Sequence, residues 1–408
     1  MRKSKQPART HDRNQSGEIL EVEVERILPG GAGLAHAGGK TILVGLAAPG
    51  DRLRVRVRRT KGKTAFASIE KIIEPSPVRC EPPCPYFGRC GGCDFQQLTY
   101  DAQLYAKVEI IRDCLRRIAR VDYQKEIPIH ASPLEWQYRS RAQWQRDTVR
   151  NHLGYFERGT HNICDVVECP VLVPSLQETL NDLRERMRNG SLLDDVKEFQ
   201  SVAGDEGVAL VPSLDKDSSA EASITIGEFS YSFRADGFFQ INRSLLGELI
   251  EAAVADARGE TAIDLYCGAG LFTLPLARRF HSVIGIEAVE AAVEYARRNL
   301  AGAGLTNAKA ERAIVSDWLK ENAQKLAPVD LVLLDPPRAG AEPGAIEGIL
   351  ALKPLRIVYV SCDPATLARD LKELVVDNYS LDSIAAFDMF PQTHHVETVV
   401  HLANRVSF

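Results

Sequence analysis

The chain has 408 residues, of which 45% are hydrophobic and 26% are charged; this balance excludes a disordered or fibrous protein and allows two to four domains at about 100–200 residues each. No apolar run reaches the ~18 residues of a membrane span, and the polar N-terminus lacks the apolar core of a secretion signal. We therefore expect a cytoplasmic protein that meets no membrane, and nothing in the sequence indicates an obligate protein partner.

The net charge of −5 hides an excess of positive charge at one end of the chain. Residues 1–63 hold 14 Lys and Arg against 6 Asp and Glu and so carry +8, while the remaining 345 residues carry −13. Residues 1–16 are a short basic tail without periodicity, for which we expect disorder. Such an excess predicts that the N-terminal segment meets a polyanion.

The next segment, residues 17–75, has the pattern of a small β-barrel, because short alternating runs are separated by Pro-Gly turns. In residues 52–58 the alternation places Leu53, Val55 and Val57 on one face and four arginines on the other. Within residues 52–63, seven of the twelve side chains are basic and none is acidic. We interpret the stripe as a surface that binds the phosphates of a nucleic acid, in preference to a merely solvated strand face.

Residues 76–234 are predicted to form a central β-rich domain that begins with a cysteine-rich knot. Cys84, Cys90 and Cys93 are separated by five and two residues, with glycines between them, and glycine lets the backbone turn tightly enough for thiols to converge. Cys169 follows later in the chain. In a chain without a secretion signal such a cluster is typical of a metal site, and four thiolates suit either a structural zinc or an iron–sulfur cluster.

Two further segments of this domain have a recognisable pattern. Residues 101–121 have apolar side chains at helical spacing and predict an amphipathic helix. In residues 136–144 aromatic side chains occupy alternate positions, with arginines on the opposite set. This pattern is typical either of RNA handling or of a strand with an aromatic core face, and both interpretations stay open.

From residue 235 onward strand and helix patterns alternate, which predicts a doubly wound, Rossmann-like α/β domain over 235–408. Asp264 lies in an apolar strand that runs into a glycine turn, and Glu287 ends the next strand, where a carboxylate accepts hydrogen bonds from ribose hydroxyls. Thr273 stands where a dinucleotide-binding loop would have its third glycine. This arrangement favours S-adenosylmethionine over NAD as the cofactor.

Three later segments bring polar residues to the same edge of the predicted sheet. Asp335 begins the sequence Asp-Pro-Pro-Arg after an apolar strand. Cys362 follows another apolar strand just ahead of a predicted helix, whose positive end would favour a thiolate. Residues 388–398, which include Glu397, open the last strand. Because ligands of open α/β sheets bind at the carboxyl ends of the strands, these residues are candidates for the functional site.

Taken together, these motifs resemble the RNA uracil-5 methyltransferases over nearly the whole chain. The resemblance rests on five segments: Phe239–Asn242, Asp264–Gly270, Asp335–Gly340, Ser361–Pro364, and Phe390–Thr393 with Glu397. It implies an N-terminal small β-barrel of the TRAM type, which is OB-like and binds RNA, a central β-rich iron–sulfur domain as in the 23S ribosomal RNA branch, and a C-terminal methyltransferase domain.

The resemblance also implies roles for individual residues. S-adenosylmethionine would contact Gln240, Tyr266, Glu287 and Asp335. Cys362 would be the nucleophile and Glu397 the base. A [4Fe–4S] cluster would be bound by Cys84, Cys90, Cys93 and Cys169. Cys80 and Cys164 would not be ligands.

The implied reaction is methylation of carbon 5 of a uridine in 23S ribosomal RNA. Carbon 5 is a poor nucleophile, so the thiolate of Cys362 would add to carbon 6 of the flipped base and make an enolate, and Glu397 would remove the carbon 5 proton after methyl transfer. A tRNA uracil-5 methyltransferase shares these motifs and is the main competing hypothesis. Two more distant hypotheses are an amino-methyltransferase that uses Asp335-Pro336-Pro337 and a non-catalytic iron–sulfur protein that binds RNA or senses redox state.

Overall fold

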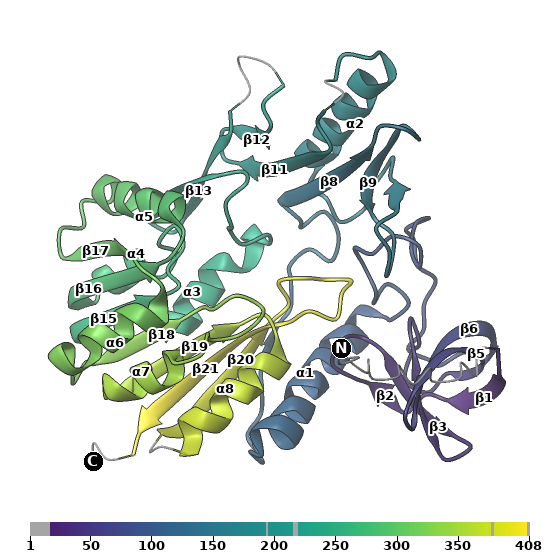
Figure 1. Ribbon diagram of the computed structural model, residues 1–408, viewed down its shortest axis with the longest axis horizontal. Helices are drawn as coiled ribbons and strands as arrows, with labels where there is room; N and C mark the ends of the chain where they lie inside the picture. The colour runs from purple at the N-terminus through teal and green to yellow at the C-terminus, as the bar shows by residue number, and fades with distance from the viewer. Residues whose placement is uncertain (1–16, 193–194, 215–218, 377–378, 406–408) are drawn as a thin grey trace, which may run out of the picture. The chain divides into compact units, whose positions relative to one another are not determined.

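The computed structural model describes residues 17–192, 195–214, 219–376 and 379–405 (Figure 1). Contacts divide the chain into two compact units, Met1–Glu81 with Gln97–Thr99 and Pro82–Gln96 with Tyr100–Phe408. The basic tail expected at residues 1–16 lies outside the described residues. No helix in the described part combines the length and the apolar character of a membrane span.

The first unit is a six-stranded sheet in the order β1-β5-β6-β4-β3-β2. Residues 19–27 supply both edge strands, because β1 pairs with β5 at one edge and β2 pairs with β3 at the other. One short stretch of chain thus joins the two edges, and the sheet closes into a small barrel. The predicted alternation is confirmed, since Leu53, Val55 and Val57 are buried. The strands are β1 (Ile19–Glu23), β2 (Arg26–Ile27), β3 (Gly33–Ala37), β4 (Lys40–Val44), β5 (Arg52–Lys61) and β6 (Thr64–Glu74).

The second unit contains an antiparallel sheet in the order β10-β9-β8-β11-β12, and α2 (Pro174–Arg188) packs its leucines into the same core. Tyr138 and Trp144 are buried, and Arg141 donates a hydrogen bond to the carbonyl of Ala235 at 3.0 Å. Burial of Tyr138 and Trp144 favours an aromatic core face, but Trp136 is only partly buried and a role in RNA handling stays a prediction. The strands are β8 (Arg141–Asp147), β9 (His152–Phe156), β10 (Ile163–Asp165), β11 (Glu198–Gly204) and β12 (Gly207–Val211), and a separate hairpin follows with β13 (Glu221–Ile226) and β14 (Phe229–Arg234).

The rest of this unit is built on an eight-stranded sheet in the order β17-β16-β15-β18-β19-β21-β20-β7. Strand β21 runs antiparallel to both of its neighbours, while the other pairs are parallel. The strands are β7 (Ile129–His130), β15 (Gly259–Leu265), β16 (Phe280–Glu287), β17 (Ala308–Arg312), β18 (Leu331–Leu334), β19 (Arg356–Ser361), β20 (Tyr379–Phe387) and β21 (Glu397–Asn404).

Helices cover both faces of this sheet. Figure 1 shows one group on one face, α3 (Leu246–Val254), α4 (Thr273–Ala277) and α5 (Glu290–Gly302), and a second group on the other, α6 (Val315–Leu326), α7 (Ala345–Ala351) and α8 (Pro364–Val376). The strand order reverses between β15 and β18, so the carboxyl ends of these two strands form a topological switch point, the place where open α/β sheets bind ligands.

The helix predicted over residues 101–121 forms as α1 (Tyr100–Cys114), continued by the π-helical turn η1 (Leu115–Ala119). Its buried face differs from the apolar stripe that the spacing predicts. Gln103 and Lys107 are fully buried, whereas Leu104 remains partly exposed. Burial of these two polar side chains indicates polar partners elsewhere in the unit.

Candidate functional site

A glycine turn follows β15 at the switch point of the sheet. Tyr266 and Gly268 have positive φ angles of 62° and 53°, and Gly270 has one of 92°. The φ angle of Gly270 is one that residues with a side chain rarely adopt, so glycine is favoured there. Gly268 and Gly270 have no side chains, so a ligand can approach the backbone at these two positions, as in nucleotide-binding turns.

Glu287, at the end of β16, lies against this turn. Its Oε2 accepts a hydrogen bond from the backbone N of Gly268 at 3.2 Å, and its Oε1 accepts one from the backbone N of Val289 at 2.8 Å. These bonds fix the carboxylate at the strand end, the position from which ribose hydroxyls are bound. The phenol oxygen of Tyr266 accepts a hydrogen bond from the backbone N of Glu342 at 3.4 Å, which ties the turn to the loop after β18.

Asp264, the next-to-last residue of β15, is completely buried, and its Oδ2 accepts a hydrogen bond from the hydroxyl of Thr273. Burial raises the pKa of Asp264 to about 7; the bond from Thr273 opposes this rise and the charge of Glu287 adds to it. Thr273 is therefore the partner of a buried carboxyl group. Comparison with a dinucleotide-binding loop shows only that Thr273 replaces a glycine. The contact with Asp264 could not be predicted, because it depends on how the helix that begins at Thr273 packs on β15.

Asp335 follows β18, and its backbone N donates to the carbonyl of Leu265 at 3.3 Å, which places it beside the end of β15. Burial raises the pKa of Asp335 to about 7, and the charge of Asp264 contributes. Gln240, the fourth predicted cofactor residue, is buried just ahead of the short helix η2 (Arg243–Leu245). Three of the four thus meet at one sheet edge, while in the described residues no hydrogen bond joins Gln240 to them.

Cys362 and Glu397, the predicted nucleophile and base, come from neighbouring antiparallel strands. β19 ends at Ser361, which pairs with Thr398 in β21, so the next position along the ladder puts Cys362 opposite Glu397. Burial raises the pKa of Cys362 to about 12, and the charges of Glu397 and Asp335 add to this effect. In the chain alone, burial therefore outweighs the thiolate stabilisation that we expect from the helix behind Cys362.

Glu397 is 1% exposed, and neither of its carboxyl oxygens has a hydrogen-bond partner in the described part of the chain. Burial raises the pKa of Glu397 well above its usual range, with the charge of Asp335 acting in the same direction and Arg338 opposing them. A buried carboxyl group without a partner costs free energy. We therefore interpret its position as one that a bound ligand completes.

The loop between β20 and β21, residues 388–396, is held by α1. Lys107 and Asp388 form an ion pair in which both side chains are completely buried. Gln103 donates to Oε1 of Gln392 at 3.0 Å, and its own Oε1 accepts from the backbone N of Gln392 at 2.9 Å. Sequence reasoning missed Gln103 and Lys107, because nothing in a single sequence distinguishes a polar side chain with a buried partner from one on the helix surface.

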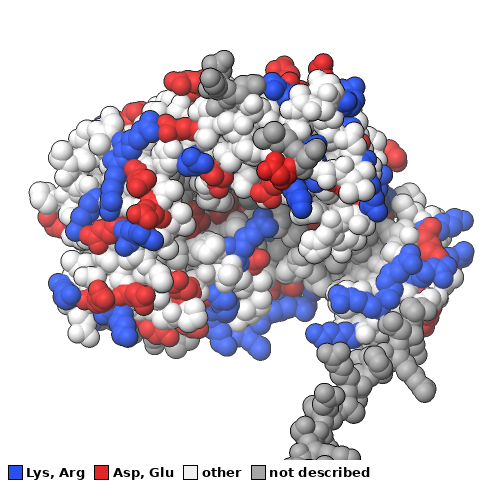
Figure 2. All heavy atoms as spheres, turned by 45° about the horizontal axis from the view of Figure 1, so that its top comes forward, with Lys and Arg blue, Asp and Glu red and all other residues white. Residues whose placement is uncertain are grey.

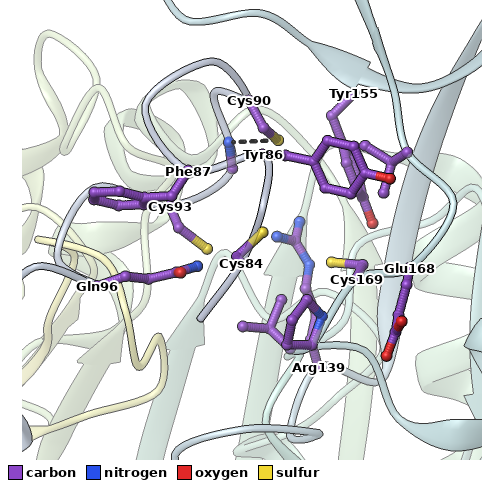
Figure 3. Close-up of a pocket in the computed structure, with 14 residues that line it drawn as sticks. Cys84, Tyr86, Phe87, Cys90, Cys93, Gln96, Arg139, Tyr155, Glu168 and Cys169 are labelled. Atoms are coloured by element: carbon purple, nitrogen blue, oxygen red, sulfur yellow. Dashed lines mark hydrogen bonds between the residues drawn. The ribbon is translucent and has the colours of Figure 1, made fainter. Parts of the chain in front are cut away.

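The four predicted metal ligands, Cys84, Cys90, Cys93 and Cys169, line a single pocket together with Arg139. Figure 3 shows the sulfurs of Cys84, Cys93 and Cys169 around the guanidinium group, while the sulfur of Cys90 accepts a backbone hydrogen bond of 3.4 Å. Burial raises the pKa of Cys90 to about 11 and that of Cys93 to about 12, and neighbouring thiols contribute to both shifts.

The chemistry of this donor set fits a thiolate-bound metal centre. All nine cysteines are free of disulfides, and the partly buried guanidinium of Arg139, which donates to the carbonyl of Arg141 at 2.9 Å, would offset the negative charge of neighbouring thiolates. Within the described ranges, no three His, Cys, Asp or Glu side chains stand as a group able to hold a metal ion. The pocket thus gathers the predicted ligands without arranging them around a metal. Cys164 accepts a hydrogen bond from Arg89 at 3.3 Å instead, and Cys80 belongs to the first unit.

Strand β5 of the barrel carries its basic side chains outward, but the positive stripe is interrupted. Three arginines are paired with glutamates of adjacent strands, Arg52 with Glu74 at 3.1 Å, Arg54 with Glu21 at 2.8 Å and Arg56 with Glu70 at 2.6 Å. Figure 2 shows acidic side chains among the basic ones on the barrel. These three arginines have glutamate partners on strands that the local alternation does not reveal, and phosphate binding by the stripe stays a prediction.

The far end of β5 is different. Arg58 donates to the hydroxyl of Ser68 at 2.7 Å, and Arg59 stacks over the ring of Phe66 at 3.9 Å. No carboxylate in the described chain forms an ion pair with Arg58, Arg59 or Lys61. The uncompensated positive charge of the barrel therefore includes this end of the strand.

Comparison with known proteins gives matches over most of the chain. Residues 212–405 match the family described as tRNA (Uracil-5-)-methyltransferase, and residues 20–78 match the description tRNA (uracil(54)-C(5))-methyltransferase, TRAM domain. The chain is similar to the 23S rRNA (uracil(1939)-C(5))-methyltransferase RlmD of Vibrio parahaemolyticus, with 31% identity over 93% of this chain and 94% of the relative. It is also similar to an RNA methyltransferase of Nitratidesulfovibrio vulgaris, described as uncharacterized, with 34% identity over 96% of this chain and 97% of the relative.

Among solved structures, the chain is similar to the Pyrococcus abyssi tRNA (uracil-54, C5)-methyltransferase in complex with S-adenosyl-L-homocysteine. The TM-score is 0.72 at 28% sequence identity, and the match covers 94% of this chain and 100% of that one. The similarity therefore extends across the barrel, the central sheet and the eight-stranded sheet.

Proposed function

Because the chain belongs to the RNA (uracil-5-)-methyltransferase family and is an S-adenosylmethionine-dependent enzyme with a TRAM domain, we propose that it methylates carbon 5 of a uridine in 23S ribosomal RNA in the cytoplasm. The observation that carries the chemistry is that Cys362 and Glu397 stand one position beyond the pair Ser361 and Thr398, and that the carboxyl group of Glu397 has no hydrogen-bond partner among the described residues. Membership of this family argues against the two more distant hypotheses, an amino-methyltransferase and a non-catalytic iron–sulfur protein.

S-adenosylmethionine supplies the methyl group and leaves as S-adenosylhomocysteine. Glu287 would accept the ribose hydroxyls, since its carboxylate is already fixed by backbone donors at the end of β16. Asp335 would face the positively charged sulfonium side of the cofactor, and Tyr266 and Gln240 would complete the pocket. The position of three of these residues at the carboxyl ends of adjacent strands supports this assignment.

Cys362 would act as the nucleophile. Its sulfur forms a bond to carbon 6 of the uracil ring, and the electron pair of the ring double bond moves to give an enolate with a nucleophilic carbon 5, which takes the methyl group. Glu397 then removes the proton from carbon 5. Elimination breaks the carbon–sulfur bond, restores the ring double bond and frees the thiolate. Placement of the two side chains on adjacent strand ends supports their action on the same ring.

Two other groups near Glu397 are weaker candidates for the base. Oδ1 of Asp363 already accepts hydrogen bonds from the backbone N of Ala365 and of Thr366, both at 2.9 Å, as a cap on the first turn of α8. Burial lowers the pKa of His395 to about 3, so its imidazole holds a proton poorly. A carboxyl group with a raised pKa is the better proton acceptor.

The raised pKa values of Cys362 and Glu397 mean that the chain alone favours the neutral forms of both groups. The sulfonium group of the cofactor carries a positive charge, and an opposite charge nearby favours the ionised form of a thiol or a carboxyl group. Binding of the cofactor beside Asp335 would therefore help to generate both the thiolate and the carboxylate. Activation would be confined to a site that already holds its methyl donor.

We also infer that the cysteine pocket holds a [4Fe–4S] cluster on Cys84, Cys90, Cys93 and Cys169. Convergence of these four thiols on one pocket, beside a guanidinium group that would offset their negative charge, supports this inference. The cluster would stabilise the fold of the cysteine-rich segment, and no step of methyl transfer needs it.

Transfer RNA is the second candidate substrate. The solved structure with the similarity reported above is that of a tRNA methyltransferase, while the relatives named for 23S rRNA match this chain over nearly its full length. The experiment that decides is mass-spectrometric mapping of 5-methyluridine in ribosomal RNA and tRNA from cells with and without the gene. We expect one or more 5-methyluridines to disappear from 23S ribosomal RNA only, and loss from tRNA alone would contradict the proposal.

A further inference from the structure

The cysteine pocket and the loop that leads to Glu397 are joined by direct hydrogen bonds. The backbone N atoms of Asp94 and Phe95, the two residues after Cys93, donate to the carbonyl of Gln392 at 3.1 and 3.0 Å. Oδ1 of Asp94 accepts a hydrogen bond from the backbone N of His394 at 2.9 Å. Oδ2 of Asp94 lies 2.6 Å from Nδ1 of the His394 side chain. Four short contacts thus connect two segments that lie 300 residues apart in the chain.

These contacts lie in a packed environment. Asp94 is 9% exposed, Phe95 is fully buried, and the ring of Phe95 meets the ring of His394 edge to face at 6.4 Å between centroids. Arg158 also lies 3.7 Å from the carboxylate of Asp94. Hydrogen bonds to a charged group in such surroundings are among the stronger polar contacts of a protein.

The loop needs this support, because its backbone is strained. Gln392 has a φ angle of 68°, in the left-handed region that residues other than glycine rarely adopt. Such a conformation persists only where surrounding contacts determine it. Here Gln103 holds the side chain and amide of Gln392 from one side, and the segment after Cys93 holds its carbonyl from the other.

The loop leads directly into Glu397, the first residue of β21, which pairs with Phe387 of β20. His394 is three positions before Glu397, and Val396, between them, is completely buried. Cys362, by contrast, arrives on β19 and makes no contact with the 94–95 segment among the hydrogen bonds of the described residues. A disturbance at Asp94 therefore reaches the base side of the site and leaves the nucleophile side unchanged.

We propose that Asp94 is a positioning residue that ties the cysteine pocket to the loop 388–396, so that ordering of the pocket holds Glu397 where it can take the carbon 5 proton. This inference rests on the proposed function, because it assumes that Glu397 is the base. A metal bound at Cys93 would anchor the residue next to Asp94. Loss of that metal would then slow the last step of the reaction, in addition to any effect on folding.

The test separates the two halves of the reaction. Asp94→Ala removes the carboxylate, Asp94→Asn keeps an oxygen that accepts from the backbone N of His394, and Asp101→Ala changes an exposed carboxylate of α1 as a matched control. Addition of Cys362 is measured as the covalent complex with 23S ribosomal RNA transcribed with 5-fluorouridine, since a base cannot remove fluorine as it removes a proton. Resolution is measured as the decay of the covalent complex with the natural transcript.

We expect Asp94→Ala to form the covalent complex at the wild-type rate and to resolve it about tenfold more slowly, the effect of one lost charged hydrogen bond. Asp94→Asn should recover most of this loss, Asp101→Ala should behave as wild type, and the iron content should be the same in all four proteins. His394→Ala should slow resolution as well, and combining it with Asp94→Ala should add little, because both remove the same link.

Two results would overturn the inference. One is an iron-loaded Asp94→Ala protein that resolves the complex at the wild-type rate. The other is equal slowing of complex formation and resolution in both Asp94→Ala and His394→Ala, which would assign these residues to general stability of the fold. Failure of the proposed function looks different, because wild-type protein would then form no covalent complex with either RNA.

Discussion

Cys362 and Glu397 lie opposite each other across the ladder that joins β19 and β21, one position beyond the pair formed by Ser361 and Thr398. Both strands lie in the interior of the sheet, and the residues of β19 from Ile357 to Ser361 are all buried. Backbone pairing therefore brings the proposed nucleophile and the proposed base to neighbouring strand ends. Substitution of either side chain should remove one chemical step without displacing the group that performs the other.

The first prediction concerns the barrel. Replacing Arg58, Arg59 and Lys61 by glutamine should weaken RNA binding and reduce the slope of log affinity against log salt by about two to three units, because each phosphate contact releases counterions. Replacing Arg52, Arg54 and Arg56 is the matched control of equal charge. Their glutamate partners already offset their charge, so the slope should change less. Filter binding or fluorescence anisotropy at a series of salt concentrations measures both, and equal slopes for the two triple variants would refute the assignment.

The second prediction concerns the cysteine pocket. Protein purified without oxygen should be brown and contain about four irons per chain. Cys84→Ser, Cys93→Ser and Cys169→Ser should each lose most of the iron and the visible absorption, whereas Cys164→Ser should keep both, because its sulfur is engaged with Arg89 outside the pocket. Metal analysis together with absorption spectra provides the measurement. Stoichiometric zinc without iron in the wild-type protein would contradict the cluster.

The third prediction uses the carboxyl group of Asp335, a partly buried residue. Burial and the charge of Asp264 raise the pKa of Asp335 to about 7. Below that pH the carboxyl group of Asp335 is protonated in the chain alone. A sulfonium cation bound beside it would favour loss of this proton. Affinity for S-adenosylmethionine should therefore rise about tenfold per pH unit as the pH increases toward 7 and then level off. S-adenosylhomocysteine, which lacks the positive charge, should show a much flatter profile.

Calorimetry in buffers of different ionisation enthalpy measures the released proton directly. We expect Asp335→Asn to bind S-adenosylmethionine more weakly and to release fewer protons near pH 6.5, since the titrating group is gone. Identical proton release with S-adenosylmethionine and S-adenosylhomocysteine would show that Asp335 does not meet the sulfonium group.

Local patterns in the sequence are sufficient to predict the structural features that depend on strand and turn periodicity. The alternation in β5 predicts which of its side chains are buried, and the placement of Cys362 and Asp335 at strand ends follows from apolar runs that stop at polar residues. Parallel strands bring their carboxyl ends to one edge, so the amino-acid sequence alone is enough to group these residues.

Features that depend on contacts between distant segments could not be predicted in this way. Lys107 lies on a helix and would pass for a surface residue, yet it forms a completely buried ion pair with Asp388. Glu21 neutralises Arg54 from another strand, and Asp94 binds His394 from the cysteine-rich segment. Each of these pairs is set by tertiary packing, which helical or strand spacing does not encode.

The most direct test of the proposed mechanism is the fate of the RNA on Glu397→Gln. Glutamine keeps the size of glutamate and loses its basicity, so methyl transfer should proceed while removal of the carbon 5 proton fails. The methylated RNA should then stay bound to the protein as a slow band on a denaturing gel, and mass spectrometry should find a methylated uridine attached to Cys362; Cys362→Ala should give no such band. A Glu397→Gln enzyme that turns over at the wild-type rate and leaves no nucleotide on Cys362 would contradict the mechanism.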